Sequence, residues 1–196
     1  MLTEQQGGAL LRLARQQIEN HLGIEASVAV TAGELNDPAF LEKRGVFVTL
    51  HKRGDLRGCI GSITAVESIA DGIRRHALNA AFYDSRFAPL AAADLPNLHV
   101  EISVLTDPQP LAYGTADELI RRLRPAIDGV ILKGPGNASA TFLPQVWQQL
   151  PTPEQFLGHL CRKAGLADGA WRSGALQIFI YQVQSFENPA KAGRQP

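Results

Sequence analysis

Residues 45–63 read GVFVTLHKRGDLRGCIGSI and form the strongest local pattern in the chain. From Val46 to Leu50, every second residue is aliphatic, which is typical of a strand with one buried face. Residues 52–55, KRGD, supply turn residues, and LRGCI then resumes an extended run. The stretch therefore predicts a β-hairpin.

The loop length fixes which residues of the hairpin face each other. With a two-residue loop at 53–54, antiparallel pairing sets Cys59 opposite Val48 and Arg57 opposite Leu50. A four-residue loop gives the same pairing. In this register His51 points to the other face of the hairpin from Cys59.

The remaining elements follow from capping residues, helical periodicity and alternation, and Thr3 with Gln6 and Thr64 with Glu67 have the spacing of capping boxes. The pattern predicts helices over residues 3–22, 64–81, 115–124 and 152–164, strands at 28–30, 98–105 and 176–186, and a second hairpin over 129–143. Strands grouped as hairpins with helices between them indicate an α+β fold, with a largely antiparallel sheet and flanking helices. No internal repeat or linker occurs, so we expect a single domain over residues 1–196.

Composition excludes several classes of function. The 19 basic and 19 acidic residues balance, so no global field favours nucleic acid or an anionic membrane. No signal peptide or span of about 20 apolar residues is present, which predicts a cytoplasmic protein with no membrane partner. The two cysteines, Cys59 and Cys161, lie far apart and indicate neither a disulfide framework nor a thiolate zinc site.

The LRGCIGSI segment carries the candidate chemistry. Gly58 and Gly61 allow close backbone approach to Cys59, and Arg57 favours a thiolate. A helix expected to begin just downstream would favour it too, and the amides from Ser62 onward could hold a phosphate or carboxylate. The alternative is a core cysteine, because free cysteine is among the most buried residue types.

Acid–base partners for a thiol are less clearly marked. His51, His76 and His99 are candidate bases, although none has diagnostic spacing. Asp84 and Arg86 in the DSRF segment are candidates for substrate binding, since arginine suits carboxylate or phosphate recognition. The other interpretation is a local ion pair that braces the loop.

Several segments together resemble one family. They are GVFVTLHKRGDLRGCIGSI, NAAFYDSRFAPL, LPNLHVEISVL, DGVIL, TFLPQVW, FLGHLCRKAGL and the closing aromatic-rich strand with Glu187. In this order, from about residue 8 to residue 188, they are similar to the AMMECR family, whose bacterial members are called AmmeMemoRadiSam system protein A.

The resemblance implies an α+β fold with a larger and a smaller lobe, intertwined in one AMMECR domain, and residues 189–196 are then expected to be a flexible tail. It also implies association with a MEMO-family protein and a radical SAM protein. It implies no known reaction.

Two functional hypotheses follow. The first is an enzyme that acts on a small molecule or a protein side chain, with Cys59 as nucleophile or redox thiol. The second is a non-catalytic adaptor, in which RGCIG shapes a turn and the loop around residues 84–90 binds a protein. Nucleic-acid binding would need a basic groove, which the charge balance does not predict. No P-loop, GxGxxG, HExxH, EF-hand or GxSxG motif occurs, so no cofactor or metal is evident.

Overall fold

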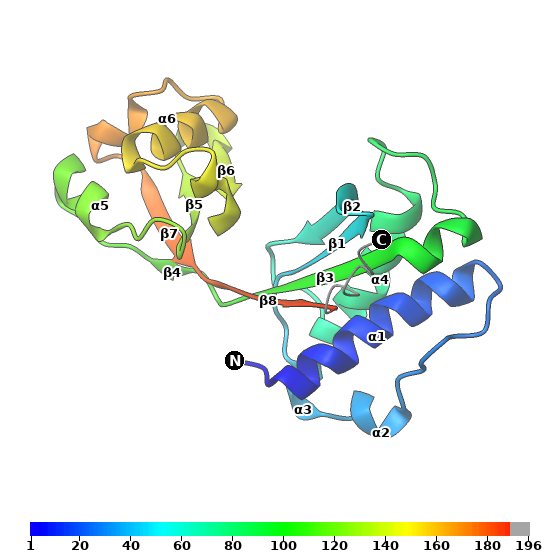
Figure 1. Ribbon diagram of the computed structural model, residues 1–196. Helices are drawn as coiled ribbons and strands as arrows, with labels where there is room; N and C mark the ends of the chain where they lie inside the picture. The colour runs from blue at the N-terminus through cyan, green and yellow to red at the C-terminus, as the bar shows by residue number, and fades with distance from the viewer. Residues whose placement is uncertain (189–196) are drawn as a thin grey trace, which may run out of the picture. The chain divides into compact units, whose positions relative to one another are not determined.

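The computed structural model describes residues 1–188, and these residues form two compact units (Figure 1). Unit 1 contains residues 1–105 and 184–188, and unit 2 contains Thr106–Val183. The chain therefore leaves unit 1 after Leu105 and returns to it at Gln184. The predicted flexible tail, residues 189–196, lies outside the described residues.

Unit 1 consists of a four-stranded sheet and four helices. The helices are α1 (Glu4–His21), α2 (Ala32–Leu35), α3 (Pro38–Leu41) and α4 (Ile69–Phe82), with a 3-10 helix at Ala92–Asn97. The strands are β1 (Val46–Lys52), β2 (Asp55–Ser62), β3 (Leu98–Leu105) and β8 (Val183–Glu187), in the order β2-β1-β3-β8. β2 is thus an edge strand.

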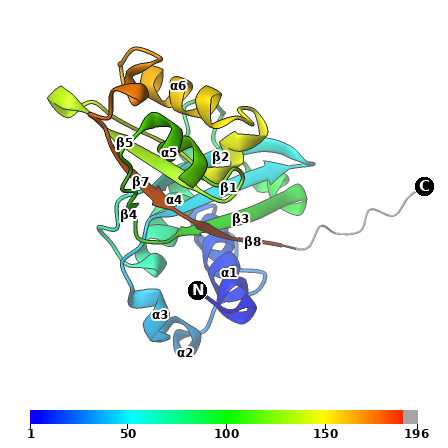
Figure 2. The same ribbon diagram turned by 90° about the vertical axis from the view of Figure 1, so that its left-hand side faces the viewer.

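One face of this sheet packs against α1 and α4. Helix α4 contacts β1 and β2, and α1 contacts α4 and β3, as both ribbon views show (Figures 1 and 2). Val46, Val48 and Leu50 point into this core and are at most 1% exposed. The half-buried residues that alternate with them define the opposite face, which we call the outer face.

Helix α1 begins and ends where its sequence predicts. The Thr3 side chain accepts the N–H of Gln6, and the Gln6 side chain accepts the N–H of Thr3, which completes the predicted capping box. Gly23 follows the helix with φ +71°, a conformation that favours glycine. Leu10, Leu13 and Ile18 form the buried stripe.

One predicted strand of unit 1 is absent, and one predicted helix begins later than expected. Residues 28–30 form no strand, and the helix predicted from residue 64 begins only at Ile69. The Ser68 hydroxyl caps it by accepting the N–H of Asp71. Glu67, predicted as the capping partner of Thr64, instead forms an ion pair with Arg75. The two capping patterns are adjacent in the sequence, and the helix uses the later one, which begins at Ser68.

Unit 2 has a second antiparallel sheet in the order β4-β7-β5-β6. Its strands are β4 (Gln109–Pro110), β5 (Gly129–Lys133), β6 (Ser139–Phe142) and β7 (Gln177–Tyr181), and its helices are α5 (Ala116–Arg122) and α6 (Pro153–Lys163). Short 3-10 helices lie at Pro135–Asn137, Pro144–Gln148 and Ala170–Ser173. The predicted hairpin over 129–143 is confirmed as β5 and β6. In the core, Trp147 stacks on Phe156 with 3.9 Å between ring centroids.

The strand predicted over residues 176–186 divides between the two sheets. β7 ends at Tyr181 in the sheet of unit 2, and β8 begins at Val183 in the sheet of unit 1. The Gln182 carbonyl accepts the N–H of Thr106, and the Gln182 N–H donates to the Thr106 hydroxyl. The two segments that connect the units are thereby joined at this point. The predicted α+β class with antiparallel pairing is confirmed. The strands, however, form two separate sheets and not one.

Candidate functional site

A β-bulge decides where Cys59 points. The two-residue turn is confirmed, because Lys52 pairs with Asp55. The register then shifts, so that Arg57 has no partner on β1 and Cys59 lies opposite Thr49. The predicted pairing of Cys59 with Val48 and of Arg57 with Leu50 is therefore wrong by one residue.

The shift also reverses the prediction for His51. Thr49 and His51 are two residues apart on β1, so both belong to the outer face, and Cys59 joins them there. The Cys59 side chain is half-buried and is not part of the hydrophobic core. Although His51 and Cys59 share a face, no hydrogen bond joins them in residues 1–188.

The glycines of the motif serve packing. A Cβ on Gly58 would lie 2.1 Å from the carbonyl oxygen of Ala80 in α4, so only glycine lets β2 approach this helix so closely. A Cβ on Gly61 would lie 2.2 Å from the ring of Phe47. At both positions, protein atoms fill the space that a side chain would take.

The loop after α4 holds the edge of β2 at Cys59. Asp84 Oδ2 accepts the Cys59 N–H at 2.9 Å, and Arg86 Nη2 donates to the Cys59 carbonyl at 3.3 Å. An edge strand leaves such backbone groups without a partner strand. We call this pair of side chains the latch, because it fixes the backbone of Cys59 from the open side.

Within the latch, the Asp84 carboxylate is fully engaged. Arg86 donates to it from Nε at 2.9 Å, from Nη2 at 2.7 Å and from its backbone N–H at 3.2 Å. These bonds and the one from Cys59 hold the pKa of Asp84 far below its ordinary value, although burial opposes them. The predicted local ion pair is present, and the Arg86 side chain remains 54% exposed.

The thiol has two polar neighbours, Thr49 and Arg86. The Thr49 hydroxyl donates to Cys59 Sγ at 3.3 Å. Arg86 Nη2 donates to the Cys59 carbonyl, and the pKa of Arg86 is raised chiefly by its hydrogen bond to Asp84. By contrast, the helix N-terminus expected near residues 62–67 is wrong, because α4 begins ten positions beyond the cysteine. Ser62 instead accepts the N–H of Thr64 at 3.1 Å.

Arg57, the bulge residue, reaches over the same loop. Its Nη2 donates to the carbonyl of Ala88, and its guanidinium carbon lies 5.8 Å from the centroid of the Phe87 ring. The guanidinium carbon of Arg86 lies 5.4 Å from the same centroid. Arg57 Nη1 is buried and has no hydrogen-bond partner within residues 1–188.

His76 lies apart from the thiol. It is 2% exposed, and its Nε2 lies 3.2 Å from Arg75 Nη2 and 3.7 Å from Glu67 Oε1. Burial and the Arg75 charge lower the pKa of His76, while Glu67 opposes them. None of these contacts includes Cys59, so the structure does not bring this predicted base to the thiol.

The sequence interpretation missed Thr49 and Glu101. Both lie on the outer face, where Thr49 faces Cys59 on one side and Glu101 on the other. Burial raises the pKa of Glu101, and the charge of Glu187 adds to this effect while His51 opposes it. Alternation of apolar and polar residues indicates that one face of β3 is exposed to solvent, but the alignment of that face with Cys59 depends on the bulge.

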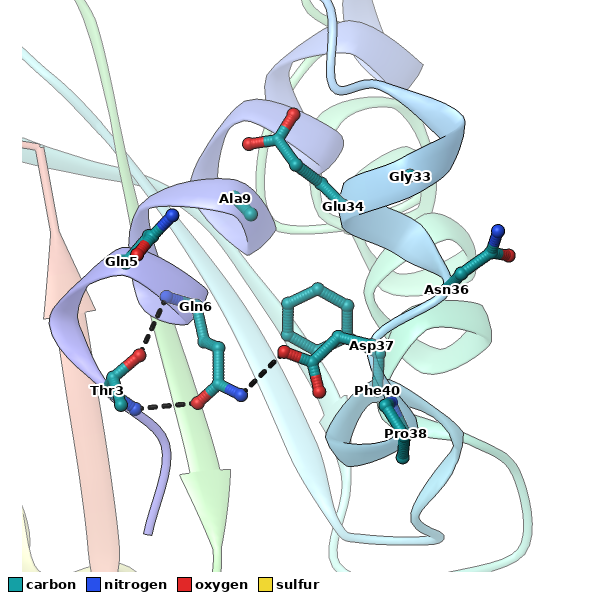
Figure 3. Close-up of a pocket in the computed structure, with 10 residues that line it drawn as sticks. All are labelled: Thr3, Gln5, Gln6, Ala9, Gly33, Glu34, Asn36, Asp37, Pro38 and Phe40. Atoms are coloured by element: carbon teal, nitrogen blue, oxygen red, sulfur yellow. Dashed lines mark hydrogen bonds between the residues drawn. The ribbon is translucent and has the colours of Figure 1, made fainter.

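In the described part of unit 1, three cavities lie away from the thiol, and Cys59 lines none of them. The first, about 540 Å³, lies at the N-terminal end of α1, where Gln6 Nε2 donates to Asp37 Oδ2 at 2.7 Å (Figure 3). The second, about 440 Å³, includes Arg12 and Arg15. The third, about 360 Å³, lies on the outer face beside His51 and Glu101.

Similarity to known proteins agrees with this arrangement. The AMMECR1 family model matches residues 11–186, which includes most of both sheets and the whole latch. This chain belongs to the AMMECR1 family. A protein from Methanosarcina barkeri is 38% identical over 195 residues, covering 98% of this chain and 95% of its own length. A protein from Thermofilum pendens is 36% identical over 207 residues, covering 98% and 94%.

A solved AMMECR1-type fold is also similar. The crystal structure of an uncharacterised protein from Pyrococcus horikoshii superposes with a TM-score of 0.81 at 33% identity, covering 96% of this chain and 94% of that one. Within residues 1–188 of this AMMECR1 chain, no helix is long and apolar enough to cross a membrane. In the same residues no group of three or more His, Cys, Asp or Glu could hold a metal ion.

Proposed function

We propose that this AMMECR1 protein is an enzyme whose reactive group is the Cys59 thiolate. The observation that supports the proposal most directly is the hydrogen bond from the Thr49 hydroxyl to Cys59 Sγ at 3.3 Å. A donor to sulfur stabilises the thiolate, which is the nucleophilic form of cysteine. The Arg86 guanidinium, held at the Cys59 carbonyl, adds a positive charge nearby.

The outer face suits attack on an electrophilic carbon of a small molecule or a protein side chain. The thiolate electron pair would form the C–S bond, and the leaving group would depart with the pair of its broken bond. His51, on the same face, is the acid–base candidate that would take the thiol proton and return it to the leaving group. The latch keeps the Cys59 backbone fixed during this exchange.

We also propose that the protein acts with a MEMO-family protein and a radical SAM protein. The support for these partners is the family resemblance, since the known associations of AMMECR-type proteins in bacteria and archaea are with these two classes. Co-purification of the full chain with each partner tests the association independently of the thiol.

Alkylation kinetics test the thiol. With iodoacetamide and mass spectrometry of the intact full chain, Cys59 should react fast, while Cys161 serves as an internal control. Cys161 is fully buried, and burial raises the pKa of its thiol. Thr49→Val should slow alkylation of Cys59 about five- to tenfold, which corresponds to one weak hydrogen bond of about 1 to 1.4 kcal/mol.

Two results would refute the enzyme hypothesis. Cys59 reacting no faster than Cys161 would show that the thiol is inert. A Cys59→Ala variant with wild-type function in a cell that needs the gene would show that the thiol is dispensable.

The adaptor is the second candidate, and the engagement of the latch favours it. Both carboxylate oxygens of Asp84 accept hydrogen bonds from groups of the protein itself. The RGCIG segment and the latch together therefore give the edge of β2 a fixed shape. Tyr83 beside the latch is 68% exposed, and Leu56 on β2 is 43% exposed. Loss of partner capture in Tyr83→Ser, with Cys59→Ala unaffected, would favour the adaptor over the enzyme.

A further inference from the structure

The third cavity has a lining that neither proposed function uses in full. Its volume of about 360 Å³ falls within the range of small-molecule sites. Four titratable side chains line it: His51, His99, Glu101 and Glu187. They come from β1, β3 and β8, three adjacent strands of the rigid sheet of unit 1.

Strand register brings these side chains together. His51 lies opposite His99, and Thr49, in the next pair on this face, lies opposite Glu101. Directly opposite residues have their Cβ atoms about 4.5–5.5 Å apart. Glu187 on β8 completes the lining beside Glu101. The cavity is therefore built from sheet positions and not from a loop.

The four side chains have no polar partner in the described part of the chain. Within residues 1–188, none of them takes part in a hydrogen bond or an ion pair. Two carboxylates thus face one cavity without a cation between them, and their mutual repulsion contributes to the raised pKa of Glu101.

Two protein cations near the cavity are engaged elsewhere. Lys52, next to His51, pairs with Asp94. Arg15, in the cavity that shares His99, pairs with Glu19 and donates to the carbonyls of residues 95 and 98. Within residues 1–188, no Lys or Arg side chain lines this cavity, so a cationic ligand would complement its two carboxylates.

We propose that this cavity binds the protonated primary amine of a small organic ligand. An ammonium group has three donors and no acceptor. Glu101 and Glu187 would each accept one donor, and an unprotonated nitrogen of His51 or His99 would accept the third. A neutral alcohol of the same size carries no charge and only one donor, so it would leave both carboxylates without a counter-charge.

The amine site and the thiol belong to one row across the sheet. Glu101, Thr49 and Cys59 lie on adjacent strands, so Glu101 and Cys59 are two strand spacings apart, about 10 Å. Resting on the proposed thiol chemistry, this spacing assigns a substrate class: an amine whose electrophilic carbon lies about 10 Å from its nitrogen. Amine binding itself does not depend on the thiol.

Binding of n-butylammonium to the full chain tests the site. Histidine ring resonances should show saturable shifts at His51 and His99, and n-butanol should produce none. Glu101→Gln, an isosteric change, should weaken binding at least about tenfold, equivalent to one charged contact. Glu187→Gln, at an exposed position, should weaken it in the same direction and guards against a folding defect in the first variant.

Two further variants separate the possible explanations. Glu25→Gln makes the same charge change at an exposed position outside the cavity and should bind like wild type. Cys59→Ser should also bind like wild type, so failure of the thiol chemistry would leave the amine site intact. Absence of saturable shifts, equal shifts with n-butanol, or wild-type affinity in both glutamate variants would overturn the proposal.

Discussion

Replacing Asp84 with asparagine should destabilise unit 1 by about 2–3 kcal/mol. The carboxylate accepts four hydrogen bonds, two at each oxygen. Asparagine keeps one oxygen and turns an NH₂ group toward the other two donors. If that side faces the Cys59 N–H, a backbone donor at the strand edge loses its acceptor, at about 1–3 kcal/mol. The exposed half of the Arg86 ion pair adds less than about 1 kcal/mol, because water can solvate it.

The pH dependence of this difference has a definite sign. The pKa of Asp84 is lower in the folded protein than in the unfolded chain, so its contribution to stability is present above about pH 4. That contribution is lost as the pH falls through the folded pKa. The difference in free energy of unfolding between wild type and Asp84→Asn should therefore be largest at pH 7 and shrink below about pH 4.

Urea denaturation followed by circular dichroism measures both effects. Glu42→Gln is the matched control, since its carboxylate is 54% exposed and pairs with Arg44 in the same unit. It should cost less than about 1 kcal/mol. Two results would show that the latch does not stabilise the edge of β2. One is a loss of stability in Asp84→Asn no larger than that in the control. The other is a stability difference that does not shrink in acid.

Two further predictions concern packing and burial. Gly58→Ala should destabilise unit 1 by about 2 kcal/mol or more, because its Cβ would meet backbone 2.1 Å away in α4. Gly8→Ala in α1, with its nearest atom at 3.7 Å, should instead stabilise by about 0.5–1 kcal/mol, and equal effects in urea denaturation would contradict this account. Burial raises the pKa of Tyr181 to about 12, so stability should be complete below about pH 10 and fall as the pH rises toward 12. In an ultraviolet titration, Tyr181→Phe should remove the step near pH 12, and its persistence in that variant would refute the assignment.

The sequence alone determined the local structure of this protein. The turn at residues 53–54, the capping box of Thr3 and Gln6, and the hairpin over 129–143 all follow from chemistry within a few residues, and all are present. The family assignment also came from the sequence, through motifs in a fixed order, and is confirmed.

Tertiary structure decided the face of Cys59 and the boundaries between elements. A bulge of one residue moved the thiol opposite Thr49, and the adjacent Gly58 packs closely on α4. Residues 176–186 contain no glycine or proline to mark a break, yet the strand divides at Gln182, since its two halves pair in different sheets.

The candidate site depends on pairings between distant residues. Asp84 lies 25 positions from the N–H that it accepts, and His99 and Glu101 face β1 only because the sheet pairs β1 with β3. Sequence periodicity gives the face on which a side chain lies but not its partner across the sheet. The types of residue at the site were therefore readable from the sequence, and their grouping was fixed by strand register.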